Sequence, residues 1–367
     1  MGNWRNGEFG NFITLKRGFD LPQQKREDGQ VPIFSSSGIT GTHSTAMVNA
    51  PGVITGRYGT IGEVFYAAED FWPLNTTLFV EDFHGNDAKF IYYFLKTLEW
   101  SKFTSASAVP GINRNTVHKE TVSLPDIETQ RRIASTLSML DEKIKTNTEI
   151  NDNLYAQAKA IFDNHFINID AIPAGWRKGN LLDIANYLNG LAMQKFRPQG
   201  NEIGLPVLKI KELRQGSCDD SSELCSLRIK PEYIIHDGDV IFSWSGSLLV
   251  DIWCGGTCGL NQHLFKVTSD IYDKWFYYLW TAHHLARFIA IAADKATTMG
   301  HIKREELAKA EVLIPCEEDY TSLTSIMQPI FELIISNRIE ARKLAALRDE
   351  LLPKLMSGEI DVSAVQL

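Results

Sequence analysis

Two stretches of the chain carry apolar residues in alternating steps of four and three. The first begins at Ile133 and the second at Leu323. This spacing places the repeated side chains along one face of a helix and is typical of coiled coils. The pattern predicts two long helices whose seams pack together, and because a whole domain connects them, they can run antiparallel. The predicted seams are Ile133, Leu137, Leu140, Ile144, Asn147, Asn151, Leu154, Ala158 and Ile161, and Leu323, Met327, Ile330, Ile334, Asn337, Ala341, Leu344, Arg348 and Leu351.

Each seam carries an asparagine, Asn147 in the first and Asn337 in the second, at the same heptad position. An asparagine in a coiled-coil core costs stability but fixes the register of the helices when it meets another polar group. The alternative is that both side chains are exposed on amphipathic helices. We therefore treat Asn147 and Asn337 as candidate register-setting residues.

The rest of the chain contains two copies of one pattern. An apolar run that leads into a glycine occurs around Val53 and again around Val240. Three more matches follow in the same order and with nearly the same separation along the chain. Although each match alone is weak, the ordered set predicts two domains of one fold. The matches are Asn75 with Asn261, Tyr92 with Tyr277 and Pro125 with Pro315.

Short β-like runs between Gly-rich turns, each set followed by an aromatic helical stretch, fill both copies. The predicted strands are Val53–Thr55, Val64–Tyr66, Thr77–Val80, Pro206–Ile210 and Val240–Trp244, and the predicted helices Asp87–Phe103 and Asp273–Ala293. We therefore expect an α+β fold with two similar α/β domains separated by two long antiparallel coiled-coil helices, related by a pseudo-two-fold axis. The expected boundaries are 1–125, 126–168, 169–315 and 316–367.

Composition is that of an ordinary globular protein, with 44% hydrophobic and 22% charged residues among 367. This length is too great for one core, in agreement with two domains. The chain has no apolar run long enough for a transmembrane helix and begins without the apolar stretch of a signal peptide. We expect a cytoplasmic protein with no membrane contact.

Five cysteines all lie in the second half of the chain, and the simplest expectation is free thiols. Cys254 and Cys258 with His263 raise the alternative of a zinc site. The set lacks the paired Cys-x-x-Cys spacing of structural zinc sites, so we predict no metal.

Motifs that carry catalysis are missing from the sequence. It contains no Gly-x-x-x-x-Gly-Lys-Ser/Thr phosphate loop, no Asn/Asp-Pro-Pro-aromatic tetrad of amino-methyltransferases, no His-Glu-x-x-His and no Gly-x-Ser-x-Gly. The acidic turn His236–Asp239 resembles part of a nuclease site. The following residues, Val240–Ser247, supply neither the additional carboxylate nor the lysine of such sites, and the sequence suits a plain turn. We expect no catalytic centre.

A glycine-rich loop, Gly56–Gly62, follows the first predicted central strand and carries Arg57, Tyr58 and Thr60. Glycines let a backbone approach a ligand closely, and arginine pairs bidentately with guanine in the major groove. The alternative is a structural turn in which Arg57 forms a local ion pair. The loop makes these residues candidates for DNA binding.

The corresponding loop in the second copy keeps the glycine and changes the polar side chains. Two readers of different half-sites would keep a scaffold in this way and vary the reading residues. The candidates are therefore Ser243, Trp244, Ser245 and Ser247, together with Thr76 and Thr77 of the first copy and Gln262 and His263 at the matching place.

Basic residues near the start of each copy are candidate phosphate contacts. The net charge of −8 has the wrong sign for a DNA binder, so it predicts weak non-specific binding by the isolated chain and suggests that partner subunits carry positive charge. The basic candidates are Lys16, Arg17, Lys25 and Arg26 in the first copy, and Lys195, Arg197, Lys209 and Lys211 in the second.

Four segments make the chain resemble the specificity (S) subunit of type I restriction–modification systems, over nearly its whole length. They are residues 53–62, 72–78, 124–133 with the pattern Pro-x-x-x-x-Gln-x-x-Ile, and 347–360. The start of the second long helix, Pro315–Tyr320, departs from the family pattern because it lacks Gln-Arg-Arg. This difference leaves open whether both helices dock partners equally.

The resemblance implies two target recognition domains, each reading one half of a split, asymmetric site in double-stranded DNA. The helices would act as a ruler and dock two methyltransferase subunits, with restriction subunits as possible further partners. A helix from Ile133 to Phe166 is about 50 Å long, against about 34 Å between half-sites one DNA turn apart. S-adenosylmethionine, ATP and Mg are expected in the partners and no cofactor in this chain, which would be a non-catalytic subunit.

Two other classes of function stay open at this stage. The chain could be a standalone DNA-modifying or DNA-cleaving enzyme, which the missing motifs disfavour. It could also be an adaptor whose coiled coil joins protein partners, in which case replacing Arg57 would leave DNA binding unchanged.

Overall fold

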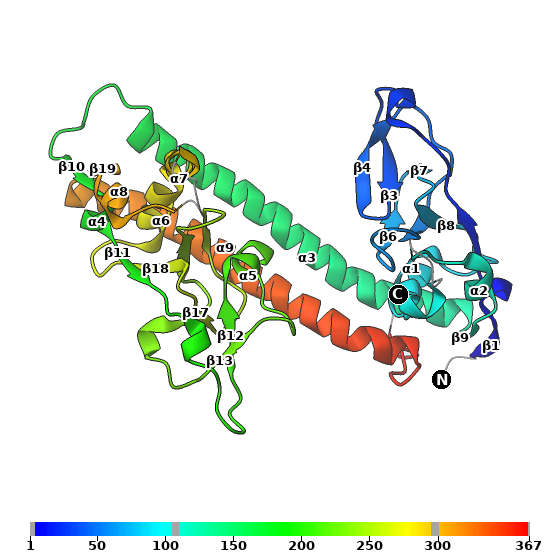
Figure 1. The fold of residues 1–367 in the computed structure, drawn as a ribbon. Helices are drawn as coiled ribbons and strands as arrows, with labels where there is room; N and C mark the ends of the chain where they lie inside the picture. The colour runs from blue at the N-terminus through cyan, green and yellow to red at the C-terminus, as the bar shows by residue number, and fades with distance from the viewer. Residues whose placement is uncertain (1–3, 105–109, 295–300, 366–367) are drawn as a thin grey trace. The chain divides into compact units, whose positions relative to one another are not determined.

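The computed structural model of the protein describes residues 4–104, 110–294 and 301–365 (Figure 1). The chain divides into two compact units, Met1–Glu142 with Ala345–Leu367, and Lys143–Leu344. Each unit contains one domain of strands and short helices, and each also contains part of both long helices. The domains are called the first and the second domain below.

The first domain is built around a four-stranded antiparallel sheet with the strand order β2–β8–β5–β6. The central strand β5 is buried along its whole length, which suits its β-branched residues. A smaller sheet has the order β4–β3–β7, β1 pairs with β9, and α1 packs on β5 and β6. The elements are β1 (Arg5–Glu8), β2 (Thr14–Arg17), β3 (Val31–Ser35), β4 (Gly38–His43), β5 (Gly52–Gly56), β6 (Val64–Ala67), β7 (Trp72–Pro73), β8 (Thr77–Asp82), α1 (Ala88–Lys96), α2 (Arg114–His118) and β9 (Thr121–Leu124).

The second domain repeats the strand order of the main sheet, and its smaller sheet has one additional strand. Its main sheet has the order β11–β18–β15–β16, all antiparallel, β10 pairs with β19, and the smaller sheet has the order β13–β12–β17–β14. The matching strand orders confirm the predicted duplication. The elements are β10 (Arg177–Asn180), α4 (Leu181–Ile184), β11 (Asn186–Asn189), β12 (Leu205–Leu208), α5 (Ile210–Gln215), β13 (Leu224–Cys225), β14 (Ile234–Ile235), β15 (Val240–Ser243), β16 (Leu249–Ile252), β17 (Cys258–Leu260), β18 (Leu264–Thr268), α6 (Lys274–His283), α7 (Leu285–Asp294), α8 (Arg304–Ala308) and β19 (Glu311–Ile314).

All five predicted strands are present, and two of them are shorter than predicted. The run from Pro206 to Ile210 ends its strand at Leu208, because Ile210 already begins α5, and the strand predicted to reach Trp244 ends at Ser243. Five aromatic residues of the predicted helices are buried in the cores of the two domains. They are Phe90, Tyr93 and Phe94 in the first domain, and Trp275 and Tyr278 in the second.

Both predicted helices of the domains differ from the structure, the first at its C-terminal end and the second in its middle. The helix expected over Asp87–Phe103 ends at Lys96, since the indole of Trp100 donates to the carbonyl of Leu95 and satisfies the last turn. The helix expected over Asp273–Ala293 breaks at His284 into α6 and α7. A ring nitrogen of His284 lies 2.8 Å from the carbonyl oxygen of Glu311, so a distant strand fixes the break.

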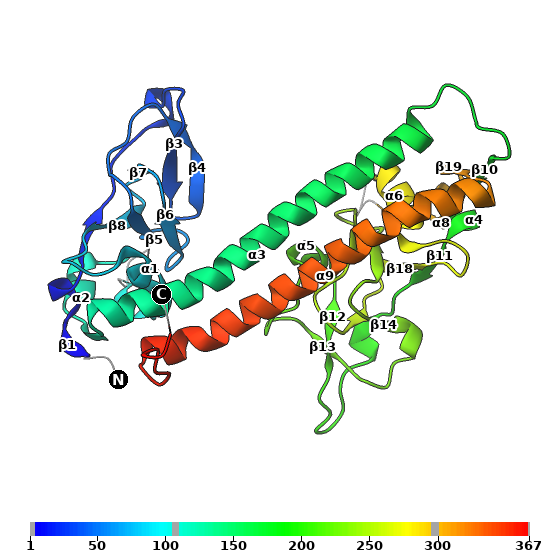
Figure 2. The ribbon, with the colours of Figure 1, turned by 180° about the vertical axis from the view of Figure 1, so that it is seen from behind.

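The two long helices are α3 (Ile127–Phe162), followed by a π-helical turn at Asp163–Ile167, and α9 (Glu317–Met356). They run antiparallel within each unit (Figures 1 and 2), and every predicted seam residue is buried or half-buried. The seam prediction is thereby confirmed. In the described part of the chain, no helix combines the length and apolar character that a membrane span requires.

The seam asparagines meet polar partners, though not as a symmetric pair of amides. Asn147 donates to Glu340 at 2.7 Å and to the carbonyl of Asn337 at 3.4 Å. Asn337 donates to the amide oxygen of Asn151 at 3.0 Å, and Asn151 in turn donates to the carbonyl of Ile334. Three asparagines therefore form one polar layer in the seam, with the geometry that a register-setting role requires.

Each long helix is joined to its own domain by a side chain in its first turn. Gln130 is fully buried and accepts a hydrogen bond at 2.9 Å from the backbone N–H of Asp87, the residue that caps α1. At the equivalent place in α9, the hydroxyl of Tyr320 accepts from the backbone N–H of Asp273, which precedes α6, at 2.6 Å. The start of the second long helix, which departs from the family pattern, thus uses a tyrosine hydroxyl as the acceptor where the first helix uses a glutamine amide oxygen.

We predict that Tyr320→Phe lowers the free energy of unfolding by about 1–3 kcal/mol, because it leaves the Asp273 N–H without its acceptor and removes the 2.8 Å bond that the hydroxyl donates to the Asp273 carboxylate. Denaturant unfolding measures the change. The half-buried Tyr272, which packs against Tyr320 with ring centroids 5.4 Å apart, provides the control Tyr272→Phe. Equal stability of the two variants would contradict the role of the Tyr320 hydroxyl.

Candidate nucleic-acid interface

A basic hollow lies on the first domain where β2, the loop after β5 and the start of α2 meet. Its volume is about 620 Å³. Four cationic side chains line it, and no carboxylate is among its lining residues, so the hollow offers a positive potential to an anionic ligand. Lys16 and Arg17 also form exposed ion pairs with Glu81 and Asp20, which lie outside the lining. We call it the first hollow, and its charged and amide residues are Lys16, Arg17, Arg57, Asn113, Arg114 and Asn115.

Arg57 is held in the first hollow by weak contacts that leave its charge available. Its guanidinium lies over the ring of Tyr58, 4.5 Å from the ring centroid, and its Nε donates to the carbonyl of Ile112 at 3.4 Å. Within the described residues no carboxylate forms an ion pair with Arg57, which disfavours the alternative of a local ion pair. The backbone N–H groups of Arg57 and Tyr58 both donate to the carbonyl of Thr76 and fix the loop.

The first residue of this loop, Gly56, must be glycine for a steric reason. A Cβ on Gly56 would lie 1.8 Å from the carbonyl oxygen of Thr60, so only glycine permits the tight return of the chain. Thr60 itself is exposed. The loop is thus a tight turn, fixed by backbone hydrogen bonds, that presents its side chains.

Thr60 and four further candidates of the first domain lie outside the first hollow. Thr77 is fully buried and donates to the carbonyl of Leu74, while Thr76 is half-buried. Lys25 is exposed at the end of a short 3-10 helix before β3, and Nη1 of Arg26 lies 3.5 Å from the carbonyl oxygen of Thr40 in β4. The structure gives Thr77 an internal bond, and its buried side chain has no surface to offer DNA in this conformation.

A second hollow, of about 440 Å³, lies on the second domain. It brings together five predicted side chains that come from three separate segments. Glu223 also lines the hollow and pairs with Arg197 at 2.7 Å and with Lys209. These partners hold the pKa of Glu223 below its ordinary value, and the hydrogen bond from Lys209 contributes most. The predicted residues in this second hollow are Arg197, Lys209, Lys211, Gln262 and His263.

The loop after β15 is braced by its own hydroxyl groups. Ser243 is fully buried and donates to the carbonyls of Ser245 and Ser247 at 3.2 and 3.0 Å. The hydroxyl of Ser245 lies 2.9 Å from Nδ1 of His263. Ser243 and Ser245 therefore shape the loop and position His263, while Ser247 is exposed.

Trp244 in the second domain is equivalent to Arg57 in the first, because each residue directly follows the apolar run that matches between the two copies. The Trp244 indole donates to Asn189 at 3.0 Å, and its ring packs against Phe265. The remaining basic candidate, Lys195, is exposed outside the second hollow. The two domains thus present different chemistry at one equivalent position of the repeat.

Sequence reasoning missed the α2 side of the first hollow. Arg114, with Asn113 and Asn115 beside it, lies there because the chain from Gly111 onward returns to the loop after β5 through a bridge to Tyr58. The signal that could have found it is the repeat, since Arg114 and Arg304 begin equivalent helices, α2 and α8.

The acidic turn before β15 is occupied by internal ion pairs. Asp239 pairs with Lys266 at 2.8 Å and accepts from the backbone N–H of His236, and Asp237 binds Arg342 of α9. No three potential metal ligands come together within the described residues. Burial raises the pKa of the Cys254 thiol to about 11, as expected for an inert buried thiol.

Comparison with known proteins agrees with this architecture. A family model described as the type I restriction modification DNA specificity domain matches residues 1–156 and 173–347. The MjaIX specificity subunit of a type I restriction enzyme from Methanocaldococcus jannaschii is 26% identical, over 76% of this chain and 70% of the relative. The HindI specificity subunit of a type I restriction enzyme from Haemophilus influenzae is 20% identical, over 72% of this chain and 75% of the relative.

A solved structure shares the fold. The S subunit of a type I restriction–modification system from M. genitalium aligns with a TM-score of 0.63 and 16% identity, over 96% of both chains. The family model covers most of the sequence in two segments, one for each domain of the observed repeat. This chain belongs to the family of type I restriction modification DNA specificity domains.

Proposed function

We propose that this protein is the DNA-specificity subunit of a type I restriction–modification complex. It binds an asymmetric bipartite site in double-stranded DNA, with one half-site for each domain. The observation that carries this proposal is the duplicated domain whose scaffold is constant and whose polar side chains differ, with Arg57 and its basic hollow in one copy and Trp244 and the second hollow in the other.

The long helices support the two-reader arrangement. α3 is continuous over 36 residues and therefore about 54 Å long, which exceeds the about 34 Å between successive major grooves on one face of DNA. In our proposal the helices set the separation of the readers and dock two methyltransferase subunits, and restriction subunits join through these.

The chemistry belongs to the partners in this proposal. S-adenosylmethionine, ATP and Mg act in the methyltransferase and restriction subunits, and this chain holds no cofactor and performs no catalysis. The observation in support is that the carboxylates most suggestive of a nuclease, Asp237 and Asp239, form ion pairs with Arg342 and Lys266. The acidic net charge fits a chain whose partners supply much of the phosphate contact.

Co-expression with the cognate methyltransferase subunit tests the bipartite site directly. We expect genome-wide mapping of methylated adenines to give one split motif with a fixed gap. A continuous motif would contradict the model of two readers. The absence of methylation in a complex that assembles would contradict the proposed function itself.

Arg57 is expected to read a base in one half-site. Arg57→Ala should weaken binding of the assembled complex to its site by about 1–3 kcal/mol and relax one position of the motif. Arg57→Lys keeps the charge and loses the planar fork, so it should fail to restore specificity. Full recovery by lysine would assign Arg57 to a phosphate, and unchanged binding by the alanine variant would favour a protein adaptor.

The isolated chain should leave DNA intact. Incubation of the purified protein with plasmid, Mg²⁺ and S-adenosylmethionine is expected to yield neither nicks nor methyl groups, as measured by gel and by radiolabel transfer. The assembled complex with the methyltransferase subunit provides the positive control. Turnover by the isolated chain would support the alternative of a standalone enzyme.

A further inference from the structure

α9 contacts the second domain in two zones of different chemistry. Toward its N-terminal end the contact is aromatic, with Tyr320 stacked on Trp275 and Phe331 against Tyr278, at centroid distances of 5.8 and 5.7 Å. These side chains belong to the largest core of the chain or pack against it. Further along α9 the contact adds two arginines, Arg338 and Arg342, to the half-buried side chains of Ile335 and Ile339.

Both arginines bind a carboxylate and a backbone carbonyl of the second domain at once. Arg338 donates from Nη1 to Asp251 at 2.8 Å and to the carbonyl of Ile252 at 3.0 Å. Arg342 forms a bidentate pair with Asp237, two bonds of 2.8 Å, and donates to the carbonyl of Cys254 at 2.6 Å. We call Arg338, Arg342, Asp237 and Asp251 the latch.

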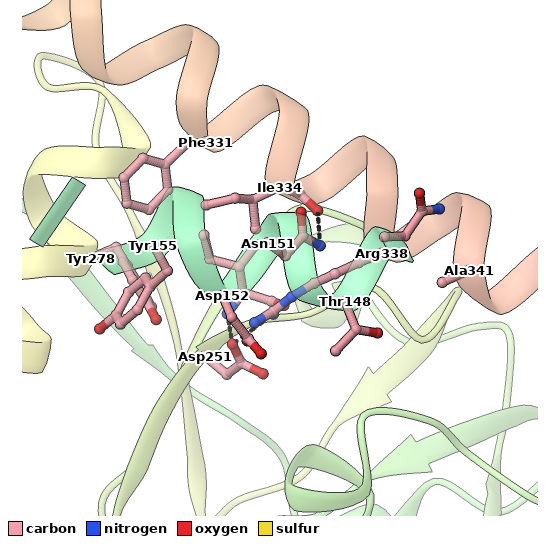
Figure 3. A pocket seen from close by; sticks show the side chains of 12 residues that line it. Thr148, Asn151, Asp152, Tyr155, Asp251, Tyr278, Phe331, Ile334, Arg338 and Ala341 are labelled. Atoms are coloured by element: carbon pink, nitrogen blue, oxygen red, sulfur yellow. Dashed lines mark hydrogen bonds and ion pairs between the residues drawn. The ribbon is translucent and has the colours of Figure 1, made fainter. Parts of the chain in front are cut away.

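Apolar packing is incomplete beside the latch. A cavity of about 280 Å³ separates parts of α3, α9 and the second domain there, and Figure 3 shows Arg338 extended across it toward Asp251. Its walls include Tyr155, Tyr278 and Phe331. The side chains that line this cavity make fewer apolar contacts with one another, and the directional bonds of the latch add to the attachment of the second domain to α9 in this zone.

The latch is absent from the other half of the repeat. With Asn147 matched to Asn337, the residues of α3 equivalent to Arg338 and Arg342 are Thr148 and Asp152, and neither is cationic. α3 contacts the first domain in a different way. Asp141 of α3 accepts a hydrogen bond of 2.6 Å from the hydroxyl of Tyr93. The latch is therefore specific to the second domain and is not required by the shared scaffold.

We infer that the latch orients the second domain on α9, and so determines the spacing between half-sites that the complex accepts. Arg338 and Arg342 are positioning residues in this reading, since they act through the domain and contact no base. Without the latch the domain stays attached through its aromatic zone and pivots about it. The inference rests on the proposed function.

The test compares spacers in the assembled methyltransferase complex. One added or removed base pair displaces a half-site by about 3.4 Å along the DNA and rotates it by about 35°. Methylation rates are measured on duplexes that carry the mapped site with its native gap and with gaps one base pair shorter and longer. We expect Arg338→Ala with Arg342→Ala to reduce the preference for the native gap by about 10-fold or more, while both half-site sequences stay unchanged.

Controls separate orientation from general damage. Lys145→Ala removes an exposed charge from α3, where Lys145 pairs with Glu149 one turn on, and should keep the wild-type gap preference. Arg342→Asp combined with Asp237→Arg restores an ion pair of reversed sense and should recover part of the preference. If the double alanine variant does not fold, Arg342→Lys provides the milder test, since it keeps the charge and loses the bidentate fork.

The outcomes are distinct. A latch variant with wild-type gap preference would overturn the inference and leave the proposed function intact. A latch variant that loses methylation equally at every gap would also overturn it, because it would show a structural role alone. A wild-type complex that methylates no split site would overturn the proposed function.

Discussion

Neither domain closes its core without the antiparallel packing of α3 on α9. In the second domain, Phe162 of α3 and Met327 of α9 belong to the same apolar cluster as the main sheet. In the first, Leu137 of α3 and Leu355 of α9 complete the cluster around α1. The seam is thus a connector and, at the same time, one wall of each domain.

Within that frame the two domains differ where the scaffold permits it. The main sheets share one strand order, and the central strands β5 and β15 are buried along their whole length. The side chains that follow the central strand are free to change because they lie beyond the buried part of the sheet, and Arg57 and Trp244 occupy that place. Variation at such positions alters the ligand without altering the fold, which is how one duplicated domain can serve two different DNA sequences.

Periodicity and repetition were enough to predict the long helices, their seam and the duplication, because all three depend on where apolar residues fall along the chain. The ends of α1 and α6 could not be predicted, since Trp100 and Glu311 act there from outside the helices. For the candidate interface, five of the residues that the sequence singled out line the second hollow. The sequence assigned Ser243 and Thr77 to the surface although both are buried, and it missed Arg114, whose position depends on a bridge between distant segments.

The exchange of Gln130 for Tyr320 has a consequence for chimeric proteins. Each side chain is matched to the backbone of the domain that precedes it, an amide oxygen for Asp87 and a phenol for Asp273. A recombination point placed between a domain and the first turn of its helix would join partners of the wrong length. The unit that can be exchanged between proteins is therefore a domain together with the first turn of the helix that follows it. Chimeric proteins are best joined after that turn.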